Sequence, residues 1–330
     1  MKYVPEGIKR YLRPLPQWAA IGACQARGSV CVWLRSGGGC FDVTENHVVA
    51  ALNPLTLALG LDVPLQRAVG DDHEPSLVFV DRQSSHSLAS LQLRYEKTLR
   101  IGAAELALYQ VQGHQQRCVR WPYRAWNSWL QGRAARKNTD PANFAMTRDS
   151  QQQIMIFYIR PRPVVLVSVE HAEHVNIFPM DLIGPVLSDR FTLALRSTSR
   201  SVEAMKACGR IALSDITAGD VQIAHALGRH HRQATMDLAT LPFAIERSPH
   251  FSLPIPAIAL RIREFEIMDF AAVGSHTLFV CRQQFERRVR DGVPLCHTSG
   301  IYQHFRSRQR QPLTSAHPCP PRQSAPDPKQ

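Results

Sequence analysis

Hydrophobic and polar positions alternate along residues 191–195, and the spacing then changes. Apolar side chains occupy every second position of FTLAL, which predicts a strand with one face on a core. Over 201–208 the apolar positions recur every three residues, which predicts a helix that ends at Gly209. These helical positions are Val202, Met205 and Cys208. The chain therefore passes from a strand into a helix within a few residues.

Short apolar runs of the same kind dominate the second half of the chain. They lie at 154–159, 164–169, 191–195, 211–213, 257–262 and 277–280. Two predicted helices, over 201–208 and 220–227, interrupt them. Strands in mixed order with inserted helices favour a closed or partly closed barrel over a doubly wound parallel sheet.

The first part of the chain shows fewer apolar runs. They lie at 30–34, 55–61, 77–80 and 106–111 and predict strands. Thr44 is placed to cap a helix over 45–52. These patterns indicate a small α+β unit.

The 330 residues exceed a typical single domain, so we expect more than one. The boundaries that the patterns suggest are an N-terminal α+β domain at 1–112, a basic and aromatic connector at 113–152, a barrel at 153–310 and a disordered tail at 311–330. The expected fold class is α+β and rich in β-structure. The tail is assigned from its six prolines and few large apolar groups.

The net charge of +12 is concentrated in two stretches, 115–137 and 282–322. The first also holds several aromatic side chains, a mixture that single-stranded nucleic-acid binding uses. Tyr123, Trp126 and Trp129 recur every three residues, however, and this favours one aromatic helical face packed between domains. Binding of nucleic acid is the disfavoured alternative.

The sequence offers no sign of membrane insertion or export. The longest apolar run, 154–159, is too short to cross a bilayer, and Arg10, Arg13, Pro14 and Pro16 interrupt any secretory signal. A cytoplasmic location is therefore expected. The eight cysteines follow no repeating frame, which fits reduced thiols, and no His or Cys pair forms a complete metal-ligand set.

The strand-to-helix junction has the chemistry of an anion site. A helix N-terminus presents unpaired N–H groups and positive partial charge. Two arginines and three hydroxyls occupy that end, and we infer that they bind the phosphate of a cofactor. The residues are Arg196, Ser197, Thr198, Ser199 and Arg200. The alternative is an ordinary capped helix with two solvated arginines.

Several short motifs occur in a characteristic order. They are Tyr158-Ile159-Arg160-Pro161, the run 164–169, the segment His174-Val175-Asn176-Ile177-Phe178-Pro179-Met180-Asp181, the junction 196–201 and Gly274-Ser275-His276-Thr277-Leu278-Phe279. In this order and spacing, residues 153–302 resemble the flavin reductase-like, FMN-binding split-barrel family. The junction lies where that family holds phosphate, so the resemblance agrees with the anion-site argument.

The resemblance implies an FMN site, with FAD as a possible substitute, and a homodimer. The phosphate would lie on residues 196–200, and the flavin ring along the segment that follows the first long strand. The implied ring residues are Asn176, Pro179, Met180, Asp181, Leu182 and Ile183. Two of them depart from the family pattern: Pro179 has no N–H to donate, and an ionised Asp181 disfavours a negatively charged reduced flavin.

His276 is the implied catalytic residue. By resemblance it lines the nicotinamide site, where it positions the nicotinamide or supplies a proton; a hydrogen-bonded structural histidine is the alternative. The implied activity is hydride transfer from NAD(P)H to flavin, with a flavin-dependent monooxygenase or another acceptor as partner. A non-catalytic flavin-binding module with a protein-interaction N-terminal domain is the second hypothesis, and a nucleic-acid-associated protein with a vestigial barrel is the third.

Overall fold

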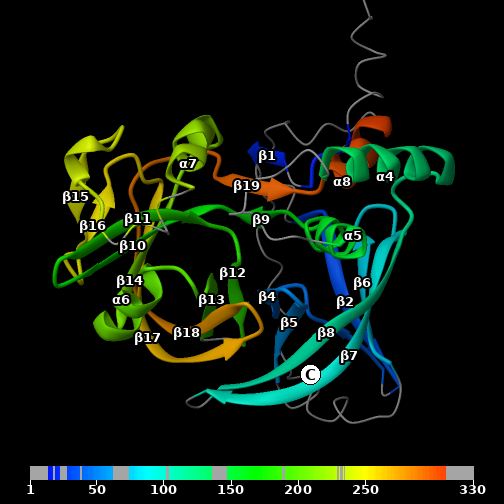
Figure 1. Ribbon diagram of the computed structural model, residues 1–330, viewed down its shortest axis with the longest axis horizontal. Coiled ribbons are helices and arrows are strands. Elements are labelled where there is room, and N and C mark those ends of the chain that lie inside the picture. The colour runs from blue at the N-terminus through cyan, green and yellow to red at the C-terminus, as the bar shows by residue number, and fades with distance from the viewer. Residues whose placement is uncertain are drawn as a thin grey trace, which may run out of the picture.

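A computed structural model describes residues 14–309, except for 18, 23–27, 38, 62–73, 102–103, 136–146, 188–189, 229, 231–232 and 234. The predicted tail at 311–330 lies outside the described residues. Two curled antiparallel sheets lie side by side and fill most of the molecule (Figure 1). The β-rich α+β fold with a split barrel that the sequence predicts is confirmed.

The C-terminal sheet has seven strands in the order β11-β10-β14-β17-β18-β13-β12. Their bounds are β10 Val165–His171, β11 His174–Met180, β12 Ile183–Val186, β13 Arg190–Arg196, β14 Arg210–Asp215, β17 Arg261–Val273 and β18 His276–Arg288. All neighbouring strands are antiparallel. Strands β17 and β18 form the longest hairpin of this sheet.

The N-terminal sheet also has seven strands, in the order β3-β2-β6-β7-β8-β5-β4. Their bounds are β2 Val30–Ser36, β3 Gly39–Asp42, β4 His47–Leu52, β5 Leu55–Gly60, β6 Ser76–Asp81, β7 Ser87–Ile101 and β8 Ala104–Gln116. The pairs are again antiparallel throughout.

Smaller elements close the ends of the two sheets. A three-stranded sheet joins β1 Ala19–Gly22, β19 Leu295–Thr298 and β9 Arg162–Pro163, and a hairpin joins β15 Ile245–Arg247 to β16 Pro254–Pro256. The helices are α4 Trp121–Ala135, α5 Arg148–Phe157, α6 Ser201–Cys208, α7 Val221–Leu227 and α8 Gly300–Arg308, with 3-10 turns η1 Ala218–Asp220 and η3 Leu238–Thr240.

The predicted strand over 154–159 is wrong, because α5 covers Arg148–Phe157. The side-chain oxygen of Thr147 accepts a hydrogen bond from the Ser150 N–H and caps the helix. All residues from Gln152 to Phe157 are buried, so the apolar run marks a helix end enclosed on all sides. Periodicity cannot distinguish such a segment from a buried strand.

The predicted helix over 45–52 is also wrong, since β4 occupies His47–Leu52. Its residues 47–51 are buried on both faces, and the run contains two adjacent valines, which favour a strand. The Thr44 side chain does not cap a helix; its oxygen accepts a hydrogen bond from the Val32 N–H at 2.8 Å.

The aromatic helix exists as α4, but its aromatic face is not packed between domains. Trp126 is 40% exposed and Trp129 is 50% exposed, and the two rings stack on each other at 5.0 Å between centroids. Tyr123 alone of the three predicted residues packs inward, stacked on His304 of α8.

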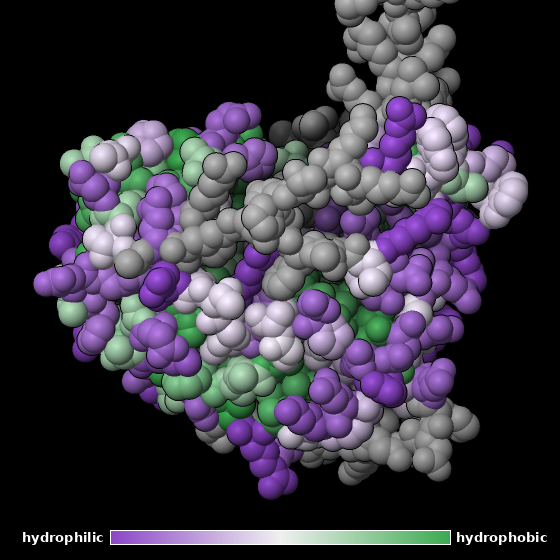
Figure 2. Space-filling model, in the orientation of Figure 1, coloured by the Kyte–Doolittle hydropathy of each residue, from purple (hydrophilic) through white to green (hydrophobic). Residues whose placement is uncertain are grey.

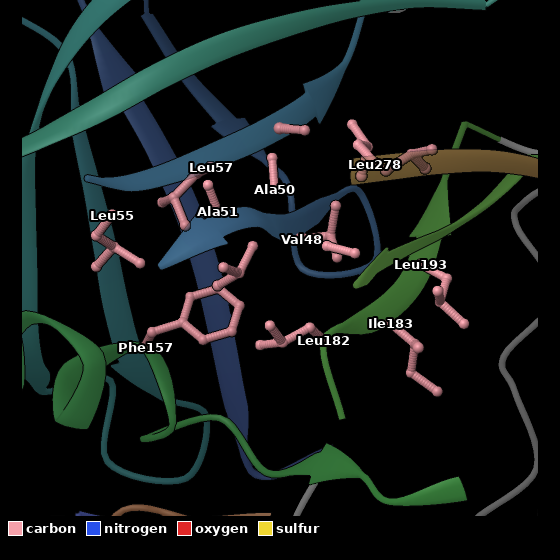
Figure 3. Packing of buried hydrophobic residues seen from close by; sticks show 14 of the residues in the cluster. Val48, Ala50, Ala51, Leu55, Leu57, Phe157, Leu182, Ile183, Leu193 and Leu278 are labelled. Carbon is pink, nitrogen blue, oxygen red and sulfur yellow. The ribbon is translucent and has the colours of Figure 1, made fainter. Parts of the chain in front are cut away.

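One hydrophobic core joins the two sheets. A single cluster of buried side chains runs from Val30 through β4 and β5 to α5 and on to Val280 and Tyr302. Figure 3 shows Val48, Ala51 and Leu57 of the N-terminal sheet beside Leu182 and Phe157. The two halves of the chain therefore share one hydrophobic core and are not separate domains joined by a linker.

The face seen in Figure 2 is largely hydrophilic, with small groups of apolar residues between the polar ones. Among the helices that the structure describes, none is long and apolar enough to cross a membrane.

Candidate anion-binding site

The predicted junction is present as a turn between β13 and α6. Strand β13 ends at Arg196, residues 197–200 form the turn, and α6 begins at Ser201. The helix ends as predicted, at Gly209 in the left-handed conformation with φ 67°. Because α6 packs on β10, its first turn is held at the end of the C-terminal sheet.

Hydrogen bonds fix the inner side of this turn. The Ser199 N–H donates to the Arg196 carbonyl at 2.8 Å, and the Ser199 hydroxyl oxygen accepts from the Ser201 N–H at 3.3 Å. Ser199 is 5% exposed, so it shapes the turn from within. The Ser197 hydroxyl lies 3.1 Å from that of Thr277 on β18.

The outer side of the turn is open to solvent. Thr198 and Arg200 are exposed, and no other described residue gives either side chain a hydrogen bond or ion pair. An arginine and a hydroxyl at the start of a helix are donors for a phosphate or another anion. The turn thus has a fixed inner half and an outer half that is available to a ligand.

His276 lies next to this turn. It is the first residue of β18 and pairs directly with Arg196 at the end of β13. Its Nδ1 lies 2.9 Å from the Ser275 hydroxyl, and the side chain is 1% exposed. Burial, with a further contribution from the Arg196 charge, lowers the pKa of His276 to about 4, so the imidazole is neutral at physiological pH.

Asn176, the first of the predicted ring residues, lies behind the turn. Its side-chain amide donates to the Ser201 hydroxyl at 3.1 Å and to the His230 carbonyl at 2.8 Å. The residue is fully buried on β11. In this structure Asn176 braces the first residue of α6 and so supports the turn that carries the arginines.

Asp181 lies in a polar cluster that sequence reasoning did not predict. Its Oδ2 accepts hydrogen bonds from the Tyr158 hydroxyl at 2.8 Å and pairs with His297 Nδ1 at 2.7 Å. Burial acts to raise the pKa of Asp181, but the His297 and Tyr158 hydrogen bonds outweigh it and hold that pKa below its usual range. Burial and the neighbouring Asp181 raise the pKa of Tyr158 well above its usual value.

The remaining predicted ring residues follow Asn176 along the chain. Leu182 and Ile183 are buried in the core shared by the two halves, and Met180 is 9% exposed. Pro179 is half-buried on β11, where it pairs with Leu166 of β10. The structure therefore brings residues 196–200 and His276 together, with Asn176 behind them, and directs Asp181 towards Tyr158 and His297.

Sequence reasoning missed Ser275, Thr277 and His297 as neighbours of these groups. Ser275 and Thr277 flank His276 in the same motif, so the motif itself was the available signal. His297 lies 116 residues from Asp181, and nothing in the local pattern connects them. In the described part of the chain, no group of His, Cys, Asp and Glu residues could hold a metal ion.

The family comparison gives an independent assignment of this half of the chain. Residues 157–305 match the family model described as "Flavin reductase like domain". This segment is similar to the flavin reductase-like family. The expectation from the sequence motifs, which placed the resemblance at 153–302, is confirmed.

Several solved structures of flavin-binding proteins and flavin reductases are similar to this part of the chain. The flavin reductase-like domain is similar to an FMN-binding protein from Thermus thermophilus, at 22% identity over 39% of this chain and 72% of that one, with a TM-score of 0.34. An NADH:FAD oxidoreductase of Streptomyces globisporus is 18% identical over 48% of this chain and 95% of its own, with a TM-score of 0.42. The flavin reductase of a Pseudomonas putida styrene monooxygenase is 19% identical over 44% and 92%, with a TM-score of 0.36. No curated protein sequence matches the chain.

Proposed function

We propose that the flavin reductase-like domain binds FMN and transfers hydride from NAD(P)H to it, for delivery to a flavin-dependent monooxygenase or another acceptor. The observation that carries the proposal is the open outer half of the β13–α6 turn. Thr198 and Arg200 are exposed there without partners among the described residues, next to Arg196. This donor set suits a phosphate dianion, which is the charged end of FMN.

Each residue of the turn has a distinct part in holding the phosphate. Arg196 and Arg200 supply charge, Thr198 supplies a hydroxyl, and Ser199 keeps the backbone in place through its bond to Ser201. When bound, the flavin would supply a ring that accepts hydride. Asn176 acts from behind by fixing Ser201. FAD offers the same phosphate chemistry and is the alternative cofactor.

His276 is proposed to position the nicotinamide. Its pKa of about 4 makes it neutral at pH 7, so it acts as a hydrogen-bonding imidazole and not as a charged acid. The Ser275 hydroxyl at Nδ1 fixes the ring orientation. His276 would thus orient the nicotinamide, and the hydride itself would pass between the two cofactors.

A non-catalytic flavin-binding module is the second candidate, and Asp181 is the observation that favours it. The lowered pKa leaves this carboxylate ionised at neutral pH, and a negative charge near the ring opposes formation of an anionic reduced flavin. In the reductase the hydrogen bonds from Tyr158 and His297 offset that charge.

The phosphate assignment is tested by comparing FMN with riboflavin, which lacks the phosphate. The double variant Arg196→Ala with Arg200→Ala is expected to weaken FMN binding by about a hundredfold or more and riboflavin binding far less, because each arginine supplies a charge-assisted hydrogen bond of about 1.5–3 kcal/mol. Arg287→Ala is the matched control, since this exposed arginine lies towards the other end of β18. Equal losses for both flavins would contradict the assignment.

Measuring NAD(P)H oxidation distinguishes a flavin reductase from a non-catalytic flavin-binding module. Protein purified without added flavin is expected to be yellow, and NAD(P)H absorbance should fall steadily when FMN and oxygen are supplied. His276→Ala should retain FMN affinity and lower the rate. Flavin binding with no NAD(P)H oxidation would favour the module, and an unchanged rate in His276→Ala would return that residue to a structural role. The cytoplasmic location expected from the sequence stays a prediction.

A further inference from the structure

The two seven-stranded sheets have the same topology. In the C-terminal sheet the central hairpin β17–β18 is flanked by β14, β10 and β11 on one side and by β13 and β12 on the other. In the N-terminal sheet the hairpin β7–β8 is flanked by β6, β2 and β3 on one side and by β5 and β4 on the other. Taken in chain order, the seven strands of one sheet correspond one to one with those of the other.

The long hairpins match in their irregularities as well. From the open end of the β7–β8 hairpin towards its turn, the second strand first has one unpaired, bulged residue, and three regular pairs follow. Then the first strand has one bulged residue, and five regular pairs lead to the turn. The β17–β18 hairpin has the same two shifts, in the same strands, separated by the same three pairs and followed by the same five. Bulges are specific and conserved features of a fold, so two bulges at the same positions indicate that the two hairpins share one architecture.

The outer strands β2, β3 and β6 also match β10, β11 and β14 in their pairing with one another. Val30 pairs with Asp81 at one end of the β2–β6 ladder, and Val165 pairs with Asp215 at the matching end of β10–β14. The ladder to the central hairpin is shifted, because Ala89 pairs with Phe79 whereas the matching Arg261 pairs with Asp215 and not with the residue two positions before it. The two sheets therefore align residue by residue within their hairpins and strand by strand across the whole sheet.

Two of the contacts between the halves join equivalent elements, and β4 packs on β13 and β18 as well. Strand β4 packs on β12, and β7 packs on β17, which are two pairs of corresponding strands. A Cβ placed on Gly184 would lie 3.9 Å from Val48, and these two residues occupy matching positions in β12 and β4. Contact between equivalent positions is what a two-fold interface between identical subunits produces.

We propose that residues 30–116 are a second, diverged copy of the barrel at 165–288 and that this copy takes the place of a partner subunit. A single chain then forms the two-barrel unit by itself, as a monomer. The inference about the fold rests on topology and register alone; the number of flavin sites given next rests also on the proposed function.

The diverged copy has lost the residues of the anion site. Gly60 and Ala194 occupy matching positions, since they pair with Leu106 and Leu278. In the sequence, the second to sixth residues after them read DVPLQ (62–66) in the first copy and RSTSR (196–200) in the second. Those five positions carry no arginine and no hydroxyl, and an aspartate replaces Arg196. Ala104 stands where the C-terminal copy has His276. The pseudo-dimer therefore has one flavin site.

The diverged copy still supports that one site. The turn between β4 and β5 docks on the turn that precedes His276: the Asn53 N–H donates to the Ser275 hydroxyl at 3.2 Å, and the Ser275 N–H donates to the Asn53 carbonyl at 3.1 Å. Ser275 in turn contacts His276 Nδ1. In a symmetric dimer this support would come from another chain.

Sedimentation equilibrium of the full chain without flavin tests the monomer directly. The expected mass is 37.1 kDa across micromolar concentrations, because the surface that a partner barrel would cover is already covered. A mass of two chains would overturn the proposal. This measurement does not depend on flavin binding and so remains decisive if the proposed function fails.

Fluorescence titration with FMN tests the single site. One FMN per chain is expected, and the double variant Arg196→Ala with Arg200→Ala should remove it without leaving a second, weaker site. Two FMN per chain would overturn the inference that the N-terminal copy has lost its site. No FMN binding at all would contradict the proposed function instead, and the mass alone would then decide the pseudo-dimer.

Discussion

Arg196 and His276 lie directly opposite each other on β13 and β18, so a permanent positive charge faces a buried imidazole. Burial is the larger cause of the lowered His276 pKa, and the Arg196 charge adds to it. The arrangement keeps His276 neutral where the predicted site needs a hydrogen-bonding ring.

The neutral His276 has a consequence for stability against pH. Its pKa is about 4 in the folded protein and about 6.5 when unfolded, so the unfolded chain takes up a proton first as the pH falls. Stability that is present above pH 6.5 is therefore lost between about pH 6.5 and 4, by up to about 3 kcal/mol. Urea unfolding of the wild type and His276→Gln at several pH values measures this, and parallel curves would contradict it.

Arg196→Ala is expected to raise the pKa of His276 only part of the way towards 6.5. The variant removes the charge, while burial, the larger cause, remains. An NMR titration of the imidazole C–H resonance gives the pKa, with Arg287→Ala as the control that should leave it unchanged. A full return to the ordinary value would mean that charge and not burial dominates.

Asp181→Asn should destabilise the protein by about 1–3 kcal/mol at pH 7, because Tyr158 and His297 lose a charged acceptor. The carboxylate has a lowered pKa, so its contribution is present above its ordinary pKa and disappears as the pH falls through the lowered one. The wild type and the variant should therefore converge in acid. Asp291→Asn is the control, since that side chain is 92% exposed and its ion pair should contribute little.

Gly274→Ala should destabilise the contact between the halves. Gly274 has φ +49°, and an added Cβ would lie 2.9 Å from the Asn53 carbonyl oxygen. The left-handed conformation alone costs about 1–2 kcal/mol for a residue with a Cβ, and displacement of the β4–β5 turn adds to it. Gly132→Ala in α4 meets nothing within 4 Å and should be neutral or stabilising. Thermal unfolding compares the two, and equal midpoints would show that the turn moves aside freely.

Local patterns predicted much of the C-terminal half. The helix at 201–208 and its terminal Gly209 are as predicted, because an amphipathic spacing and a left-handed end are local properties. The predictions failed for segments that are buried on all sides. The predicted strand at 154–159 lies mostly in a helix and the predicted helix at 45–52 is mostly a strand, because neither segment shows a periodic polar face.

The duplicated topology left almost no trace in the sequence. The matching strands β6 and β14 read SLVFVD and RIALSD and share only their final aspartate. Burial requires apolar character at these positions but not particular residues, so the pattern of the fold persists while identities disappear. The turn at 196–200 was predictable because its chemistry is specific, whereas Asp181, Tyr158 and His297 meet only through tertiary packing.

The contact between the Asn53 turn and Ser275 affects which substitutions this protein can accept during evolution. When two identical chains associate, every substitution appears twice, on both sides of the axis, and must be tolerated in both places. Within one chain each side of such a contact can be altered alone. A supporting turn and the site that it supports are then free to specialise separately, which no pair of identical subunits can do.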